Sequence, residues 1–303
     1  MDPALLEKIK RWTIAALLAD DLLMGLLVLK GGNALDIAYD MTSRGSLDID
    51  FSMERDFTEA EKSRIRNQAS SLLNDEFNKE GFHAIDVQFL DRPGKIDDRV
   101  KDFWGGYQLC FKIISDNVMQ KHKNDLDALR RQAVSLTPGD KKIYTVDISK
   151  YEYIGKTRPK EIDGTVIHVY SPEMLALEKV RAICQQDELY REIIISMTQR
   201  PRARDFFDIH NLFKTFAIDF TTPENVDLAQ HIFAAKRVPL EFICRIPLMY
   251  EFHANDWESV IQTIGREEEV REFKFYFDFV VNTFSFLCSG SPSLEDKTVS
   301  SAG

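Results

Sequence analysis

Two aspartates that alternate with apolar residues constrain this chain more than any other feature. Residues 47–52 read Leu-Asp-Ile-Asp-Phe-Ser, which has the two-residue period of a half-buried strand. Because side chains alternate along a strand, Asp48 and Asp50 are expected on one face, about 7 Å apart. The apolar residues between them would face the core. The predicted strand therefore presents two carboxylates that can share a divalent cation.

A glycine pair lies upstream of this strand. The apolar run at residues 26–29 predicts a short strand that ends at Gly31 and Gly32, and Asn33 is expected to cap a helix that runs to about Met41. Backbone N–H groups at such glycines can approach phosphate oxygens at a helix N-terminus. Either motif alone is more simply explained by a turn or by an edge strand with solvated acids. Their order in the chain favours a nucleotide site.

Two later segments can supply a third carboxylate. Residues 143–149 alternate apolar and polar side chains, which predicts a strand with Asp147 between Val146 and Ile148. Asp86, between Ile85 and Val87, shows the same short pattern. The pattern alone does not decide which of these two aspartates is the third carboxylate.

The rest of the sequence separates into a sheet-forming part and a helical part. In the first part, further strands are predicted at residues 84–90 and 108–114, and helices at residues 4–19, 58–78 and 117–135. From the helix start Ser171-Pro172-Glu173 onward the patterns are helical, at residues 172–186, 188–197, 203–215, 224–233, 237–248, 255–264 and 268–286. We predict an α+β fold with a mixed sheet and flanking helices in residues 1–170. A helical bundle is expected in residues 171–288 and a disordered tail in residues 289–303.

Composition narrows the functional classes. The formal net charge of -10 argues against a protein that coats long nucleic acid, although basic segments at residues 130–131, 156–160 and 200–204 could bind RNA phosphates if they converge. The four cysteines are scattered, which argues against a zinc knuckle or a disulfide framework and favours a reducing cytoplasm. No apolar run is long enough to span a membrane.

The order of these motifs resembles the DNA polymerase β-type nucleotidyltransferase superfamily. That superfamily has a hydrophobic-Gly-[Gly/Ser] turn, then [Asp/Glu]-hydrophobic-[Asp/Glu], then a third acid on a later strand. Over residues 20–215 the chain is further similar to the AbiEii/AbiGii toxin family. The matching residues are Lys30-Gly31-Gly32, Arg44-x-Ser46-x-Asp48-Ile49-Asp50, Lys179, and Arg204-Asp205-x-x-Asp208.

The resemblance implies a site and a reaction. It favours Asp147 over Asp86, because the third acid of the family lies on the strand before the helical part. It implies metal ligands (Asp48, Asp50, Asp147) for Mg²⁺ or Mn²⁺, further catalytic residues (Lys179, Asp205), and nucleotide-binding residues (Gly31, Gly32, Asn33, Ser46, Lys179, Arg204). Family members are toxins of toxin–antitoxin or abortive-infection pairs, and some relatives transfer nucleotides from an NTP to the 3′ end of tRNA. A cognate antitoxin is an expected partner.

Some residues depart from the family pattern or have simpler explanations. Asn33 stands where the family usually has Ser or Thr, and the charged stretch at residues 115–140 looks like an insertion. Lys179 could lie along apolar neighbours with its ammonium in water, and Arg204 and Asp208 have the spacing of a helix-surface ion pair. The acceptor could also be a small molecule or a protein, and a non-catalytic nucleotide-binding protein is the alternative outside the enzyme class.

Overall fold

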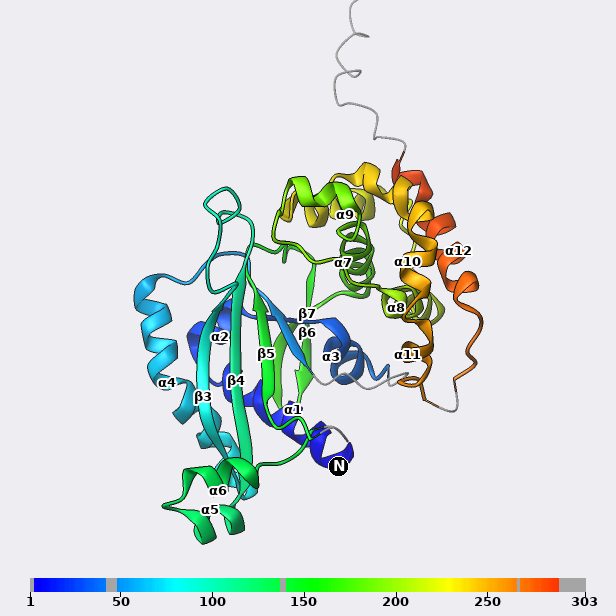
Figure 1. Ribbon diagram of the computed structural model, residues 1–303. Helices are drawn as coiled ribbons and strands as arrows, with labels where there is room; N and C mark the ends of the chain where they lie inside the picture. Colours follow the sequence, from blue (N-terminus) through cyan, green and yellow to red (C-terminus); the bar gives the residue numbers. More distant parts are fainter. Residues whose placement is uncertain (1–2, 42–47, 137–139, 266–267, 289–303) are drawn as a thin grey trace, which may run out of the picture. The chain divides into compact units, whose positions relative to one another are not determined.

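The first part of the chain builds one seven-stranded sheet. Its strands are β1 (Val28–Lys30), β2 (Ile49–Ser52), β3 (Phe82–Arg92), β4 (Gly106–Ser115), β5 (Tyr144–Ser149), β6 (Thr157–Ile162) and β7 (Thr165–Tyr170). In the computed structural model (Figure 1) they have the order β3-β4-β5-β2-β1-β7-β6. The structure describes residues 3–41, 48–136, 140–265 and 268–288. It divides into two compact units, Met1–Ser171 and Pro172–Gly303.

The register of the central strands aligns an apolar row across the sheet. β2 runs antiparallel to β1 and parallel to β5, and β4 runs antiparallel to both β5 and β3. The row consists of Leu29, Phe51, Ile148 and Tyr107, which are buried register partners on successive strands. Since neighbouring residues of a strand point to opposite faces, the next row along the strands faces the other way.

Helices of this unit pack around the sheet. They are α1 (Pro3–Leu18), α2 (Asp21–Leu26), α3 (Gly31–Asn33) with the π-helical η1 (Ala34–Ala38), α4 (Glu59–Phe77), η2 (Asn78–Glu80), α5 (Asp116–His122) and α6 (Leu126–Arg131). The start of α4 is fixed by a capping box, in which Thr58 and Glu61 bind each other's backbone N–H groups. At its other end, Phe77 makes edge contacts with Phe111 of β4 and Trp12 of α1.

The predicted strands and the helices α1 and α4 are confirmed, with shifts of a few residues at their ends. One of the predicted helices is wrong, and one hairpin was missed. The charged stretch at residues 117–135 forms two short helices, because the Asp125 side chain accepts the backbone N–H of Ala128 and starts α6 anew. The hairpin of β6 and β7 was not predicted, and β7 joins the sheet by pairing with β1 in parallel.

The second unit is helical. Its elements are α7 (Pro172–Cys184), η3 (Glu188–Glu192), α8 (Ala203–Thr215), α9 (Pro223–Ala235), η4 (Leu240–Met249), α10 (Tyr250–Ala254), α11 (Trp257–Ile261), α12 (Phe273–Phe284) and η5 (Ser285–Cys288). Aromatic rings dominate its core: Phe206 of α8 stacks on Phe277 and meets Phe273 edge-on. Within the described residues, no helix is long and apolar enough to cross a membrane.

Local details of this unit differ from the sequence patterns. The segments predicted as helices near residues 188–197 and 237–248 are 3₁₀ segments, and the second contains Pro247, which lacks a backbone donor for a regular helix. Cys244 and Cys288 are paired as a disulfide, whereas Cys110 and Cys184 are free. Spacing did not predict this pair because 44 residues separate the two cysteines. The predicted tail at residues 289–303 lies outside the described residues.

Candidate active site

A polar row crosses the sheet beside the apolar one. In register order it contains Lys30 (β1), Asp50 (β2), Asp147 (β5) and Gln108 (β4), with Leu90 (β3) at its end. Register partners share a face, so these side chains lie on the face opposite to the apolar row. Two of the carboxylates predicted from the sequence are therefore direct neighbours on parallel strands.

Asp48 precedes β2 by one residue, and alternation places it on the same side as Asp50. Its side chain is 52% exposed. Its Oδ1 accepts a 2.8 Å hydrogen bond from the Thr145 hydroxyl and lies 3.5 Å from Lys141 Nζ. Strand β5 thus provides a neighbour for each carboxylate, Thr145 for Asp48 and Asp147 for Asp50.

Asp147 carries a carboxyl group whose pKa is shifted by its surroundings. Burial raises the pKa of its carboxyl above the ordinary value, and the negative charge of Asp48 raises that pKa further. Gln108 Nε2 donates a 2.8 Å hydrogen bond to Asp147 Oδ1, which opposes the shift. The strands therefore hold like charges close together in a half-buried setting, and a bound cation would relieve their repulsion.

The donor set suits a hard cation. Among the described residues, no group of three or more His, Cys, Asp or Glu side chains is gathered as a metal site. The chemistry nevertheless fits, because the two neighbouring carboxylates and Asp48 offer only oxygen ligands on one face, and Mg²⁺ prefers a few carboxylates together with phosphate oxygens. Arg44 and Ser46 of the sequence motif lie outside the described residues.

Position 31 requires a glycine, both for its backbone conformation and because Asp50 lies close to it. Its φ of +68° lies in the left-handed region, and a Cβ there would stand 2.6 Å from Asp50 Oδ2 and 3.2 Å from Asp50 Cβ and Cγ. The turn between β1 and α3 therefore packs its backbone directly against the carboxylate. No side chain can occupy this position without displacing Asp50.

We expect Gly31→Ala to impair nucleotide transfer by moving Asp50, and to destabilise the fold by about 1–3 kcal/mol through backbone strain. Steady-state kinetics and urea unfolding measure the two effects. Gly94→Ala is the matched control, since a Cβ there meets nothing within 4 Å. Equal activity of both variants would show that the Gly31 contact does not hold Asp50 in place.

Asn33 does not cap the helix, contrary to the prediction. It lies inside the helical turn, fully buried, and its Nδ2 donates a 2.5 Å hydrogen bond to the backbone carbonyl of Asp48. This hydrogen bond links α3 to the residue that precedes β2. The Asn33 side chain is therefore not used as a helix cap. Asn33 Oδ1 is buried without a hydrogen-bond partner among the described residues.

Asp86, the alternative third acid, lies elsewhere. It is in a bulge of the edge strand β3, with φ of 52°. Lys112 Nζ binds its carboxylate at 3.0 Å, and Arg130 of α6 binds it with Nε at 2.8 Å and Nη2 at 2.9 Å. This aspartate anchors the α5–α6 insertion on the sheet. The structure brings Asp147, and not Asp86, into register with Asp50.

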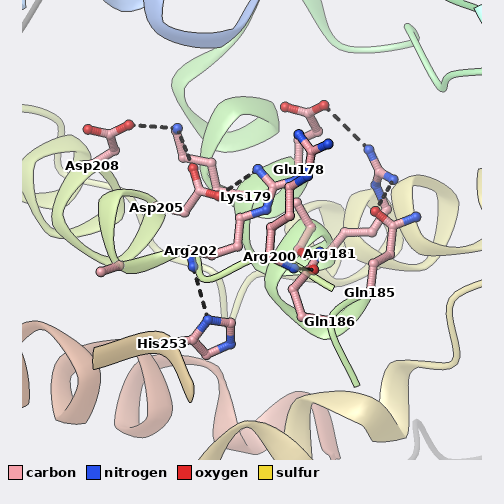
Figure 2. Close-up of polar contacts among 12 residues, drawn as sticks. Glu178, Lys179, Arg181, Gln185, Gln186, Arg200, Arg202, Asp205, Asp208 and His253 are labelled. Atoms are coloured by element: carbon pink, nitrogen blue, oxygen red, sulfur yellow. Dashed lines mark hydrogen bonds and ion pairs between the residues drawn. The ribbon is translucent and has the colours of Figure 1, made fainter. Parts of the chain in front are cut away.

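In the helical unit, Lys179 of α7 is held in a buried ion-pair cluster (Figure 2). Its Nζ donates to Asp205 Oδ1 at 2.9 Å and to Asp208 Oδ2 at 2.7 Å, both on α8. The three side chains are 8%, 9% and 2% exposed. Arg202 donates to the other oxygen of Asp205 at 3.1 Å. Asp208 is therefore buried. Its spacing from Arg204, which is exposed, had suggested a helix-surface ion pair instead.

The start of α8 is fixed by two groups from the segment around α10. His253 Nδ1 accepts the backbone N–H of Arg202 at 3.1 Å, and Asp256 Oδ1 accepts that of Ala203 at 3.2 Å. These bonds satisfy N–H groups that a helix start leaves open. Burial lowers the pKa of His253 to about 4. The neutral imidazole thus helps to hold the helix that carries Asp205 and Asp208.

This pKa predicts an acid-sensitive contribution to stability. Between pH 6.5 and about 4 the unfolded chain binds a proton at His253 that the folded chain does not, so the free energy of unfolding should fall as the pH is lowered through this window. The contribution is on the order of 3 kcal/mol at most. Urea unfolding at several pH values, compared with His253→Gln, measures it. Identical pH dependence of the two proteins would contradict this role.

Sequence reasoning missed several of these contacts. Gln108, Thr145 and Lys141 sit beside the carboxylates through strand register, which no short motif encodes. The alternation of residues 108–114 was a usable signal, because it places Gln108 on the polar face of its strand. For Arg202 and His253, 51 residues apart in the chain, the sequence carries no such signal.

A glycine turn beside paired carboxylates on a mixed sheet is the arrangement that the sequence motifs predicted for a nucleotidyltransferase, and comparison with known families identifies this class. Residues 12–279 match the model of the AbiEii family, described as nucleotidyl transferase AbiEii toxin of type IV toxin–antitoxin systems. The match extends over most of the chain, and the chain belongs to this family. It is a nucleotidyltransferase of the toxin type.

Solved structures with similar folds are distant. A candidate nucleotidyltransferase from H. pylori is 16% identical, with a TM-score of 0.45, over 95% of this chain and 96% of its own. JHP933 from Helicobacter pylori is 16% identical, with a TM-score of 0.42, over 93% and 90%. An antigenic nucleotidyltransferase-like protein from Paracoccidioides brasiliensis is 14% identical, with a TM-score of 0.37, over 84% and 92%. No curated protein matches this chain.

Proposed function

We propose that this nucleotidyltransferase moves a nucleoside monophosphate from an NTP to the 3′-hydroxyl of tRNA, in a reaction that depends on Mg²⁺ or Mn²⁺. The observation that carries the proposal is the polar row, in which Asp50 and Asp147 are register partners and Gly31 packs against Asp50. A side-chain-free turn beside paired carboxylates suits a metal-bound triphosphate.

Asp48, Asp50 and Asp147 would hold the divalent cation. When bound, this cation would offset the charge of the triphosphate and lower the pKa of the attacking hydroxyl. The hydroxyl oxygen forms a bond to the α-phosphorus, the bond to the β-phosphate oxygen breaks, and pyrophosphate leaves. Asp147 is suited to accept the hydroxyl proton, because its carboxylate neighbours Asp50 and burial raises the pKa of its carboxyl, which makes the carboxylate a stronger base.

Backbone N–H groups of Gly31 and Gly32 would bind the phosphates, while Asn33 holds their turn against the start of β2. The roles in nucleotide binding or catalysis that the resemblance implies for Ser46, Lys179, Asp205 and Arg204 stay predictions. We further propose that the chain acts in the cytoplasm as the toxin of a pair, with a cognate antitoxin as its partner.

Incubation of the purified protein with Mg²⁺, total tRNA and each labelled NTP in turn tests this function. Label should enter tRNA with the native chain and not with Asp48→Asn. Asp278→Asn, an exposed aspartate on α12 that pairs with Lys274, is the matched control and should transfer label normally.

Two other results would change the proposal. Transfer of label to proteins or small molecules, but not to tRNA, would retain the enzyme and reject this acceptor. Full activity of Asp48→Asn would reject the carboxylate site itself.

A further inference from the structure

The face of the sheet that carries the carboxylates continues on β4 and β3. Past Asp147 the polar row reaches Gln108 of β4 and Leu90 of the edge strand β3. Gln88 and Arg92 lie two residues to either side of Leu90, so alternation places them on the same face. All three β3 side chains are exposed, Leu90 to 37%. The carboxylates thus border a strip of β3 and β4 whose β3 side chains face solvent.

A chain of hydrogen bonds joins this strip to Asp147. Arg92 donates to Gln108 Oε1 with Nη2 at 2.6 Å and Nε at 3.1 Å. The amide nitrogen of the same glutamine donates to Asp147 Oδ1 at 2.8 Å. Arg92 therefore fixes which way the Gln108 amide points, and that amide fixes Asp147. Arg92 itself stays exposed, so its guanidinium keeps donors for a further anion.

Positive charge on this side of the site is local. Lys141, 45% exposed, lies 3.5 Å from Asp48, and both Lys141 and Arg92 act electrostatically on Asp147. The chain as a whole carries a net charge of -10, so cations at this place are not a general property of its surface. They would attract phosphates and repel a cationic small molecule.

The in-line geometry of phosphoryl transfer places the two substrates on opposite sides of the reacting phosphorus. In phosphoryl transfer the attacking and leaving oxygens lie roughly in line on opposite sides of the phosphorus. The glycine turn that would hold the leaving phosphates packs against Asp50, on the β1 side of the row. The attacking hydroxyl must then approach from the side of Asp147 and β4.

We infer that the exposed strip of β3 and β4, with Arg92 and Gln108 at its centre and Lys141 at its rim, is the acceptor site, and that the acceptor is a polynucleotide presenting its 3′-hydroxyl to Asp147. Arg92 binds a backbone phosphate near the 3′ end, and Leu90 offers an apolar contact for a sugar or base. Gln108 is a positioning residue that acts through Asp147. This inference rests on the proposed function and names the substrate subsite of the same centre.

Binding of a short fluorescent single-stranded oligoribonucleotide to the full chain, without NTP, tests the site. Arg92→Ala should weaken binding about tenfold or more and reduce the dependence of the affinity on salt by about one phosphate contact. Arg66→Ala is the matched control. Arg66 is an exposed arginine of α4 that pairs with Asp91 on the helix-covered side of β3, and its loss should change neither quantity.

Kinetics separate the two roles. Arg92→Ala should raise KM for the oligonucleotide and leave KM for the NTP unchanged. Gln108→Leu should lower kcat and leave KM for the NTP unchanged, because it frees Asp147 without removing a group placed against the NTP. Equal effects of Arg92→Ala and Arg66→Ala on binding, or an unchanged acceptor KM in Arg92→Ala, would overturn the assignment.

Failure of this inference can be told apart from failure of the proposed function. Mg²⁺-dependent NTP binding with transfer to a protein or a small molecule, and no oligonucleotide binding, would reject the polynucleotide site and keep the catalytic centre. Absence of Mg²⁺-dependent NTP binding by the native chain would reject the proposed function and this inference with it.

Discussion

Asp147→Asn is expected to reduce kcat for nucleotide transfer by about 10³-fold or more, because the substitution removes the carboxylate that neighbours Asp50 and that we propose as the acceptor of the hydroxyl proton. The free energy of unfolding should not fall in this variant. The raised pKa of Asp147 means that the fold holds its charged form less favourably than the unfolded chain does, and Asn can still accept the hydrogen bond from Gln108. A less active protein with equal or higher resistance to urea is the expected combination.

Asp86→Asn provides the comparison that the sequence itself suggests. Asp86 has the same apolar neighbours in the chain, but it binds Lys112 and Arg130 instead of facing Asp50. Its replacement should loosen the α5–α6 insertion and leave kcat within a few-fold of the native value. A larger loss of kcat in Asp86→Asn than in Asp147→Asn would reverse our assignment of the third carboxylate.

Lys179→Met is expected to have the largest effect on stability. It leaves Asp205 and Asp208 buried without the ammonium that both bind, and removal of one partner from a buried ion pair costs about 3–5 kcal/mol. The free energy of unfolding of the full chain in urea measures this loss. Lys274→Met, which breaks an exposed pair with Asp278 on α12, should produce a far smaller change.

A combined variant separates the structural role of Lys179 from a role in transfer. Lys179→Met with Asp205→Asn and Asp208→Asn leaves no unpaired buried charge, so much of the lost stability should return. If activity returns with stability, the cluster only supports the fold. If the stable variant stays inactive, at least one of the three side chains takes part in the reaction. No recovery of stability would contradict our account of the cluster.

Local patterns in the sequence were sufficient for the elements that carry Asp48, Asp50 and Asp147. Two-residue alternation fixes which side chains share a face of one strand. These signals involve residues close together in the chain, so they survive without knowledge of the fold. The motif order then led to the nucleotidyltransferase family.

Only the tertiary structure decided which strands are neighbours. Asp147 and Asp86 have equivalent local patterns, and the parallel pairing of β2 with β5 alone places the first beside Asp50. The same holds for the amide of Gln108, the packing of Gly31 on Asp50, and the burial of Lys179 between two carboxylates. The sequence by itself determined the chemistry available on each strand and helix. The long-range register, which depends on packing between distant segments, determined which of these groups meet.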